Sequence, residues 1–190
     1  MLKQFVNEEK ASAAWRPGLS LIYAEIGQLD EAGAEFERLA GDDFAILPRD
    51  SLWQTSLVYL AEVCDYLQNA EHARTLYRLL MPYAELTVVV GNAIVCLGAT
   101  SRFLGQLAAI QSQWDDAETH FEHAMDMNAR MNAAPWLAHT RYQYARMLSR
   151  RGKGDDMSRA NELLDQALVT AHELGMRGLI ARIKNGASDC

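Results

Sequence analysis

Apolar residues recur at intervals of three and four along most of the chain, the spacing that places them on one face of an α-helix. The pattern is clearest in residues 104–124, LGQLAAIQSQWDDAETHFEHA, where Ser112 and Gln113 separate two apolar runs. We predict two antiparallel helices here, with Gly105 and Ala117 allowing a close approach and Phe121 filling the space where the helices diverge. Neither helix can cover its own apolar stripe, so such a pair needs a neighbouring pair.

Three further segments, residues 23–39, 64–80 and 148–167, repeat this pattern. Aligning the four segments superposes four alanines and, four residues after each alanine, a large side chain. The alanines are Ala32, Ala73, Ala117 and Ala160, and the large residues are Phe36, Tyr77, Phe121 and Leu164. The alanines recur at intervals of 41, 44 and 43 residues, which indicates a repeat protein. We therefore predict an all-α fold, a right-handed α-solenoid of about four helix pairs.

The repeat pattern also predicts the boundaries of the domain and of its repeats. One repeat domain is expected over residues 13–184, with repeats at about 13–47, 51–85, 92–132 and 135–175. Residues 1–12 are expected to be a remnant of a preceding helix or a capping segment, and residues 185–190 a tail. A helix is expected over about 92–111, after a link or helix start around 86–90. Asn69 is a candidate for a left-handed turn, and Asp115 with Glu118 has the spacing of a capping box.

The repeated positions resemble those of the tetratricopeptide (TPR) repeat, which has a small residue before the turn and alanine and an aromatic residue after it. The best matches are Gly27, Leu29, Ala32 and Phe36 in the first copy, and Gly105, Trp114, Ala117 and Phe121 in the third. The period is longer than the roughly 34 residues of the standard repeat. We interpret the difference as longer helices and longer links, as in the TPR-like regions of large bacterial regulators.

The segments between the repeats resemble the C-terminal TPR-like region of large bacterial signal-transduction ATPases. Those proteins are often fused to a class III nucleotide cyclase or a LuxR-type DNA-binding domain. The segments are residues 42–53, 79–91, 96–109 and 145–156. The resemblance implies a regulatory, partner-binding region that is a fragment or a free-standing relative. The family's catalytic activities do not transfer, because this sequence has no G-x-x-x-x-G-K-[ST] phosphate loop and no cyclase metal carboxylates that we can place.

Length, net charge and cysteine spacing limit the fold and the kinds of partner that this chain can have. The chain has 190 residues, 49% of them hydrophobic, enough for one extended domain with a continuous core. Its net charge of −7 disfavours a nucleic-acid partner, because such affinity comes mainly from neutralising phosphates with Lys and Arg. The three cysteines lack metal-ligand spacing, and no secretory segment or membrane-spanning run is evident. We expect a cytoplasmic protein without a membrane partner.

Several residues have both a functional and a structural interpretation. His120 and His123 are three residues apart, but a metal site would need ligands from another helix, so we expect a solvated surface. Cys64 and Cys96 are expected to be small core residues, since no neighbouring base can be placed. For Met125, Met127 and Met131, core filling is favoured over an adaptable binding face. For Arg146, Arg150 and Arg151, complementing a helix dipole is favoured over binding an acidic partner. We predict no catalytic residue, metal ligand or cofactor.

In a TPR pair, the residues of the first helix that face neither its partner helix nor the next pair line a concave surface. By the alignment these are Glu62, Tyr66, Arg102, Gln106, His139, Tyr142, Arg146 and Arg150. The acidic residue lies in an early repeat and the basic residues lie in later repeats, so the groove would have a gradient of charge along its length. Such a groove could hold a peptide or a helix. The sequence thus predicts a non-catalytic protein-interaction scaffold, with a protein or peptide partner that could include domains of the same parent protein. A homodimer through a terminal helix is also expected. The alternative is a small-molecule sensor or helical enzyme with a pocket between repeats.

Overall fold

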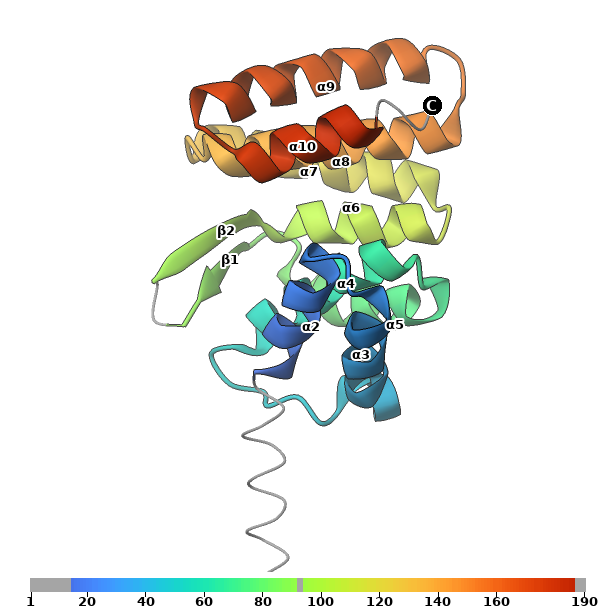
Figure 1. Ribbon diagram of the computed structural model, residues 1–190, viewed down its shortest axis with the longest axis vertical. Coiled ribbons are helices and arrows are strands. Elements are labelled where there is room, and N and C mark those ends of the chain that lie inside the picture. The colour runs from blue at the N-terminus through green and yellow to red at the C-terminus, as the bar shows by residue number, and fades with distance from the viewer. Residues whose placement is uncertain (1–14, 92–93, 187–190) are drawn as a thin grey trace, which may run out of the picture.

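Consecutive helices pack side by side, in layers that succeed one another along the longest axis of the molecule (Figure 1). The structure, a computed structural model, describes residues 15–91 and 94–186. Its helices are α2 (Arg16–Glu25), α3 (Leu29–Phe44), α4 (Trp53–Leu67), α5 (Ala70–Leu80), α6 (Thr100–Ile110), α7 (Trp114–Arg130), α8 (Ala134–Arg151), α9 (Asp156–Glu173) and α10 (Arg177–Gly186), with a short 3-10 turn, η1 (Met81–Tyr83). The all-α class is confirmed, whereas the right-handed solenoid stays a prediction.

The helices α2/α3, α4/α5, α6/α7 and α8/α9 form four pairs that correspond to the four aligned segments. The α10 helix follows the last pair and extends to Gly186. The segment expected at 1–12, and residues 187–190 of the expected tail, lie outside the described residues. Among the helices that the structure describes, none has the length and apolar character needed to cross a membrane.

The repeated alanines occupy equivalent positions. Ala32, Ala73, Ala117 and Ala160 are all fully buried. In the third pair, a Cβ atom added to Gly105 would lie 2.9 Å from the ring of Phe121, so α6 and α7 approach closely only because this position is glycine. Phe121 is itself buried and stacks on Tyr144 of the next pair, with ring centroids 5.4 Å apart. The predicted roles of Gly105 and Phe121 are therefore confirmed.

A β-hairpin separates the second and third pairs, where the sequence predicted a link and then a helix over 92–111. Strands β1 (Thr87–Val90) and β2 (Val95–Ala99) pair antiparallel, with Val89 opposite Cys96. The helix prediction is wrong for residues 94–99, because β-branched valines favour extended backbone. Gly98 has a φ of +82°, and a Cβ there would lie 2.7 Å from that of Trp136. The hairpin thus packs against α8 through a glycine.

Two predictions about helix ends are also wrong. Gln68, not Asn69, adopts the left-handed conformation, with φ +50°. Asn69 instead caps α5, since its side-chain oxygen accepts a hydrogen bond from the His72 N–H at 3.1 Å, and that role requires extended backbone. The helix α7 begins without a side-chain cap, because Glu118 turns away from the helix start and contacts α8 and α9.

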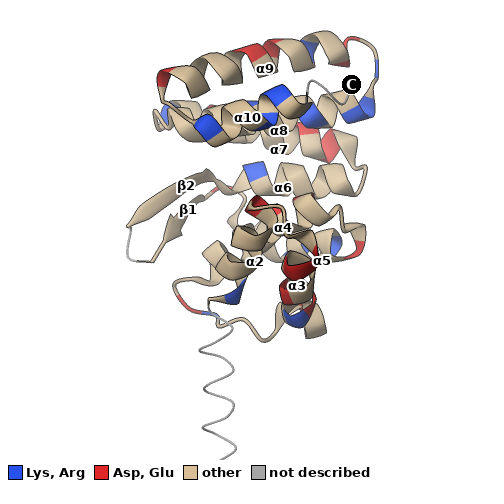
Figure 2. Cartoon of the chain, viewed as in Figure 1, with Lys and Arg blue, Asp and Glu red and all other residues tan. Residues whose placement is uncertain are grey.

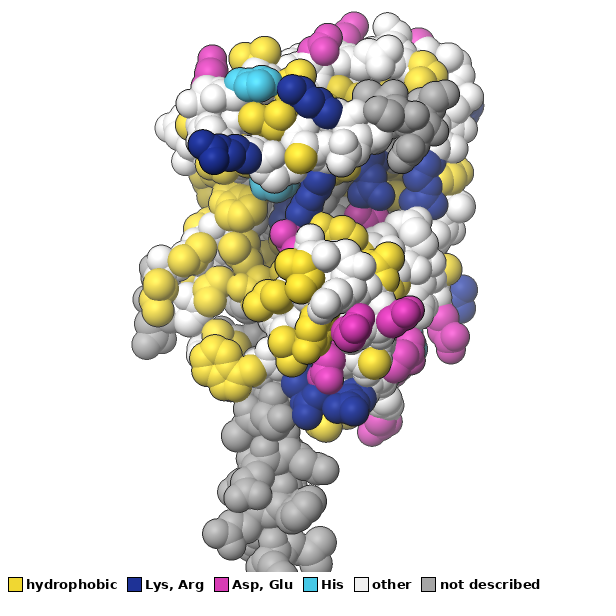
Figure 3. Space-filling model, viewed as in Figure 1, with side chains coloured by type: hydrophobic (Ala, Val, Ile, Leu, Met, Phe, Trp, Pro, Cys, Tyr) yellow, Lys and Arg dark blue, Asp and Glu magenta, His cyan; other side chains and the backbone are white. Residues whose placement is uncertain are grey.

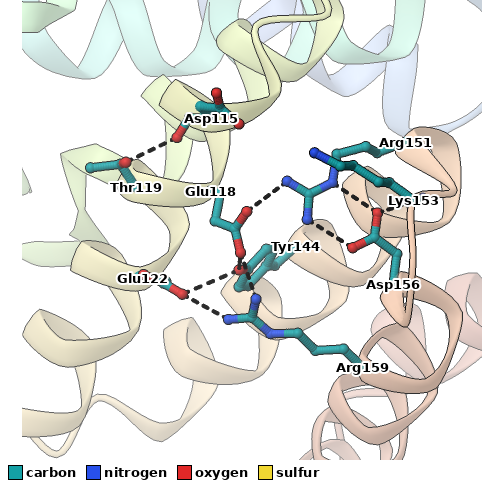
Figure 4. Close-up of polar contacts among 9 residues, drawn as sticks. All are labelled: Asp115, Glu118, Thr119, Glu122, Tyr144, Arg151, Lys153, Asp156 and Arg159. Atoms are coloured by element: carbon teal, nitrogen blue, oxygen red, sulfur yellow. Dashed lines mark hydrogen bonds and ion pairs between the residues drawn. The ribbon is translucent and has the colours of Figure 1, made fainter.

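A polar network joins α7, α8 and α9 through Glu118 (Figure 4). Its carboxylate accepts hydrogen bonds from Arg151 at 2.6 Å, from the Tyr144 hydroxyl at 2.8 Å and from Arg159. Arg151 also donates two hydrogen bonds of 2.8 Å to Asp156, which lower the pKa of Asp156 to about 2. Arg151 therefore neutralises two carboxylates, a role different from both interpretations of the arginine cluster in the sequence.

We predict that Phe121→Ala lowers the free energy of unfolding by about 3–5 kcal/mol, as expected for removal of a fully buried aromatic ring. The ring fills the space above Gly105 and against Tyr144, so its loss leaves a cavity between two pairs. Urea unfolding followed by circular dichroism measures the change. A loss below about 1 kcal/mol would show that the ring is not part of the core.

The ion pair of Asp156 predicts a pH dependence. Because its folded pKa lies below the ordinary value of about 3.9, this carboxylate stabilises the fold fully above about pH 4, and the contribution is lost as the pH falls toward about 2. We expect Asp156→Asn to flatten the dependence of stability on pH over that interval. Asp165→Asn, an exposed position in the same helix, is the control. Identical pH profiles for the wild type and Asp156→Asn would contradict the assignment.

Candidate binding cleft

A cleft runs along the inner side of the helix pairs and consists of two adjoining cavities. Their volumes are about 390 and 550 Å³, and Glu25, Glu62 and Arg182 line both. Figure 3 shows this recess between the layer of α8 and α10 and the layer of α2, with basic side chains inside it. Most lining residues come from α2, α4, α6, α8 and α10. The first helix of each pair thus faces the cleft, and the second helix lies outside.

The smaller cavity, which we call the apolar lobe, is rich in aromatic and aliphatic side chains. Its lining residues are Leu21, Glu25, Tyr59, Glu62, Leu97, Arg102, Phe103, Trp136, His139, Met176, Arg177, Gly178, Leu179 and Arg182. The larger cavity, the polar lobe, has more polar walls. It is lined by Ala24, Glu25, Gly27, Leu29, Glu62, Asp65, Tyr66, Gln68, Tyr142, Gln143, Arg146, Arg182 and Asn185.

The structure brings together all eight side chains that the alignment assigned to the concave surface. Six of them, namely Glu62, Tyr66, Arg102, His139, Tyr142 and Arg146, line one or both lobes. Gln106 and Arg150 line a small recess that shares Arg146 with the polar lobe. The expectation that all eight touch a ligand stays a prediction, and two of the eight are largely buried. Arg102 and Gln106 are only 3% and 2% exposed, because both bind Glu62.

Glu62 is the centre of a buried polar cluster at the floor of the cleft. It accepts hydrogen bonds from Arg102 at 2.6 Å and from Gln106 at 3.3 Å. Arg102 also donates to the side-chain oxygen of Gln143, at 3.0 Å. Burial opposes ionisation of Glu62, but Arg102 and Gln106 outweigh it, so the pKa of Glu62 lies below its ordinary value. The cluster therefore joins the Glu62 carboxylate of α4 to α6 and, through Arg102, to Gln143 of α8.

The other two carboxylates of the cleft are also paired with arginines. Arg146 contacts Asp65 at 2.6 Å, which joins α8 to α4. Arg182 of α10 contacts Glu25 of α2 at 2.6 Å, so the first and last described helices meet across the cleft. Arg182 also lies over the ring of Tyr66, at 5.6 Å. The acids of the cleft are thus already neutralised by the protein itself.

The cleft has an excess of positive charge. Five arginines line its lobes and recess, against three carboxylates, whereas the whole chain carries −7. Arg150 and Arg177 are exposed and have no carboxylate partner among the described residues. Burial and the nearby Arg102 lower the pKa of His139 to about 4, so this imidazole adds no charge at neutral pH. The charged residues that α10 brings to the cleft, Arg177 and Arg182, are both basic (Figure 2).

Sequence reasoning missed four of these charged groups. Asp65 follows Glu62 by three residues and shares its helix face, so the register of α4 could have identified it. Glu25 belongs to the first repeat, where the alignment assigned no concave residue. Arg177 and Arg182 lie in α10, beyond the four aligned segments, and the repeat pattern did not point to either residue.

A second polar group lies outside the cleft, beside the hairpin. His123 contacts Ser101 Oγ through Nδ1 at 2.9 Å and Glu85 through Nε2 at 3.2 Å. These residue types could form a nucleophile with its base, but Ser101 is fully buried and its hydroxyl donates to the Ala84 carbonyl at 3.0 Å. A substrate could not reach that oxygen. We interpret the group as a connection between α7 and the segment before the hairpin.

The remaining candidates are structural. His120 and His123 are partly buried, not solvated as expected, and His120 contacts the Tyr77 hydroxyl at 2.9 Å. Cys64 is buried, which raises the pKa of its thiol to about 12, whereas Cys96 is exposed and not a core residue. In the described ranges, no three His, Cys, Asp or Glu side chains are placed to hold a metal ion. Met125 packs into the core, and Met131 is 40% exposed.

We predict that Arg102→Ala destabilises the fold by about 3–5 kcal/mol, because it leaves the buried Glu62 carboxylate without its arginine. Arg150→Ala, at an exposed position of the same cleft, should change stability by no more than about 0.5 kcal/mol. Chemical denaturation of both variants measures the difference. Equal stabilities would show that the Glu62 cluster is not a structural element.

Comparisons with protein-family models, with curated proteins and with solved structures gave no match. The TPR-like interpretation therefore stays a prediction from the repeat pattern, and the cleft is the feature from which a function can be argued.

Proposed function

We propose that this chain is a non-catalytic protein-interaction module that holds an acidic peptide segment of its partner in the cleft. The observation that carries the proposal is the excess of arginine over carboxylate in the cleft of an otherwise acidic protein. Arginine binds carboxylates through two parallel hydrogen bonds, which gives both affinity and orientation. Arg150 and Arg177 are the two of these arginines that bind no acid of the described chain, whereas the other three each pair with one.

The form of the cleft supports an elongated ligand. The recess that contains Arg150 adjoins the polar lobe, which in turn adjoins the apolar lobe that contains Arg177. The two unpaired arginines therefore belong to opposite ends of the cleft. Between them, Tyr66 and Tyr142 add aromatic side chains to the lining of the polar lobe, beside Arg182 and Arg146. An extended segment with acidic residues near both ends and an apolar residue between them would complement this arrangement.

The wider biological role follows from the repeat pattern. Four helix pairs with equivalent buried alanines support the TPR-like interpretation. We propose on that basis a regulatory or partner-sensing region of a bacterial signalling or transcription regulator, acting in the cytoplasm. The partner could be another domain of the same parent protein. The negative net charge argues against a nucleic-acid partner. A homodimer through a terminal helix stays a prediction.

A small-molecule sensor is the second candidate, and the apolar lobe favours it. Its volume of about 390 Å³ lies within the range of ligand pockets in proteins. The lobe combines aromatic walls with a few polar groups, among them Arg102 and His139. The two candidates differ in the part of the cleft that is used, because a small molecule would leave the polar lobe and Arg150 without contacts.

Panning a library of short random peptides against the purified chain tests the proposal. We expect the retained peptides to be enriched in Asp and Glu, because acidic side chains pair with Arg150 and Arg177. The double variant Arg150→Glu/Arg177→Glu should lose this enrichment while keeping its stability, since both positions are exposed. Arg74→Glu, on the outer helix α5, is the matched control and should behave like the wild type.

Two results would overturn the proposal. One is a set of retained peptides without acidic enrichment. The other is the same set of peptides from the double variant as from the wild type, since binding would then occur outside the cleft.

A further inference from the structure

Arg102 is a buried cation whose hydrogen-bonding capacity is only partly used. Both of its hydrogen bonds, to Glu62 at 2.6 Å and to Gln143 at 3.0 Å, use Nη1. Its Nε is buried without a partner, and Nη2 makes no hydrogen bond within the described chain. Leaving a buried donor unpaired is unfavourable, so such a group in a native structure calls for an explanation. The Nε and Nη2 edge of a guanidinium is one that a carboxylate can bind with both oxygens.

This arginine lies among aromatic rings in the wall of the apolar lobe. Its Cζ atom is 4.0 Å from the ring centre of Phe103 and 5.7 Å from that of Trp136. Trp136 in turn stacks on His139, with centroids 5.5 Å apart. Tyr59 adds a further aromatic side chain to the same lobe. The lobe therefore offers flat apolar surfaces directly beside a cation with free donors.

The charges of the lobe select an anionic ligand. Its two carboxylates, Glu25 and Glu62, each already bind an arginine. The Arg102 guanidinium lies beside the rings of Phe103 and Trp136 and would repel a ligand cation. Arg177, which has no carboxylate partner among the described residues, adds a second positive charge to the lining. A volume of about 390 Å³ suits one aromatic ring with a short chain.

We propose that the apolar lobe binds an aromatic carboxylate, with the carboxylate at Arg102 and Arg177 and the ring beside Trp136. The source of this group is either a free aromatic acid or the C-terminal aromatic residue of a partner peptide. The inference rests on the proposed function in one respect, that the cleft binds anions. It adds the chemical class of the ligand and the lobe in which the ligand lies.

The test is a titration of the full chain with matched ligands, followed by calorimetry and by the indole N–H resonance of Trp136. The first arm compares 3-phenylpropionate with 3-phenylpropionamide and propionate. The second compares a short peptide that ends in Phe as the free acid with the same peptide as its C-terminal amide. We expect the acid to bind at least about tenfold more tightly than the amide in one arm, as befits hydrogen bonds to a charged group. The Trp136→Phe variant assigns the resonance.

Two variants locate the carboxylate. Arg177→Gln should weaken binding of the acid about tenfold and leave binding of the amide unchanged, because it removes a charge but no apolar contact. Arg102→Lys keeps the charge beside Glu62 and removes the Nε and Nη2 edge, so it should have the same effect. Arg177→Gln changes an exposed residue and keeps the test valid if Arg102→Lys does not fold. Arg130→Gln, on the outer surface of α7, is the control.

A preference for the acid in the first arm identifies a free aromatic acid, and a preference in the second arm alone identifies a peptide C-terminus. Equal binding of acid and amide in both arms would overturn the inference, as would unchanged binding to Arg177→Gln. Failure here is distinguishable from failure of the proposed function. If peptides with internal acidic residues still bind through Arg150, the cleft remains a peptide site and only the assignment of the apolar lobe is wrong.

Discussion

The close approach of the two helices in each pair is the constraint on which the rest of the structure depends. At Ala32, Ala73, Ala117 and Ala160 the side chain is no larger than a methyl group, and each alanine is fully buried. Such contacts bring the helix backbones together and leave the remaining apolar surface of each pair to be covered by the next pair. Phe121, stacked on Tyr144, is one of the side chains that makes this second contact.

This packing also determines where the charged side chains lie. Because the second helix of each pair lies outside, the first helices and α10 share one inner side, and their polar residues meet there. The Glu62 and Asp65 carboxylates of α4 are bound by arginines of α6 and α8, and Glu25 of α2 by an arginine of α10. Ion pairs between elements distant in sequence thus line a cleft that remains positive overall. A structural network and a binding surface are built from the same residues.

The sequence predicted the parts of this arrangement that depend on local periodicity. The helix pairs and their alanines follow from a spacing of three and four residues, and the cleft residues follow from the helix register. The β-hairpin was missed because a short apolar run such as 86–90 is ambiguous between strand and helix. The burial of Arg102 could not be predicted, since it depends on Glu62 and Gln143, which come from two other repeats. The α10 helix lies beyond the repeat pattern, so the alignment could not assign Arg182 to the cleft.

The central claim is that an acidic segment binds in the cleft, and chemical-shift mapping on the isotope-labelled chain tests it most directly. The titrant is a short peptide of alternating glutamate and alanine, with a lysine–alanine peptide of equal length as the comparison. The result we predict is a set of shifts confined to the first helices and α10, centred on residues such as Tyr66, Tyr142 and Arg146, with no response to the lysine peptide. Shifts centred on the outer helices α5 and α9, or equal responses to both peptides, would contradict the claim.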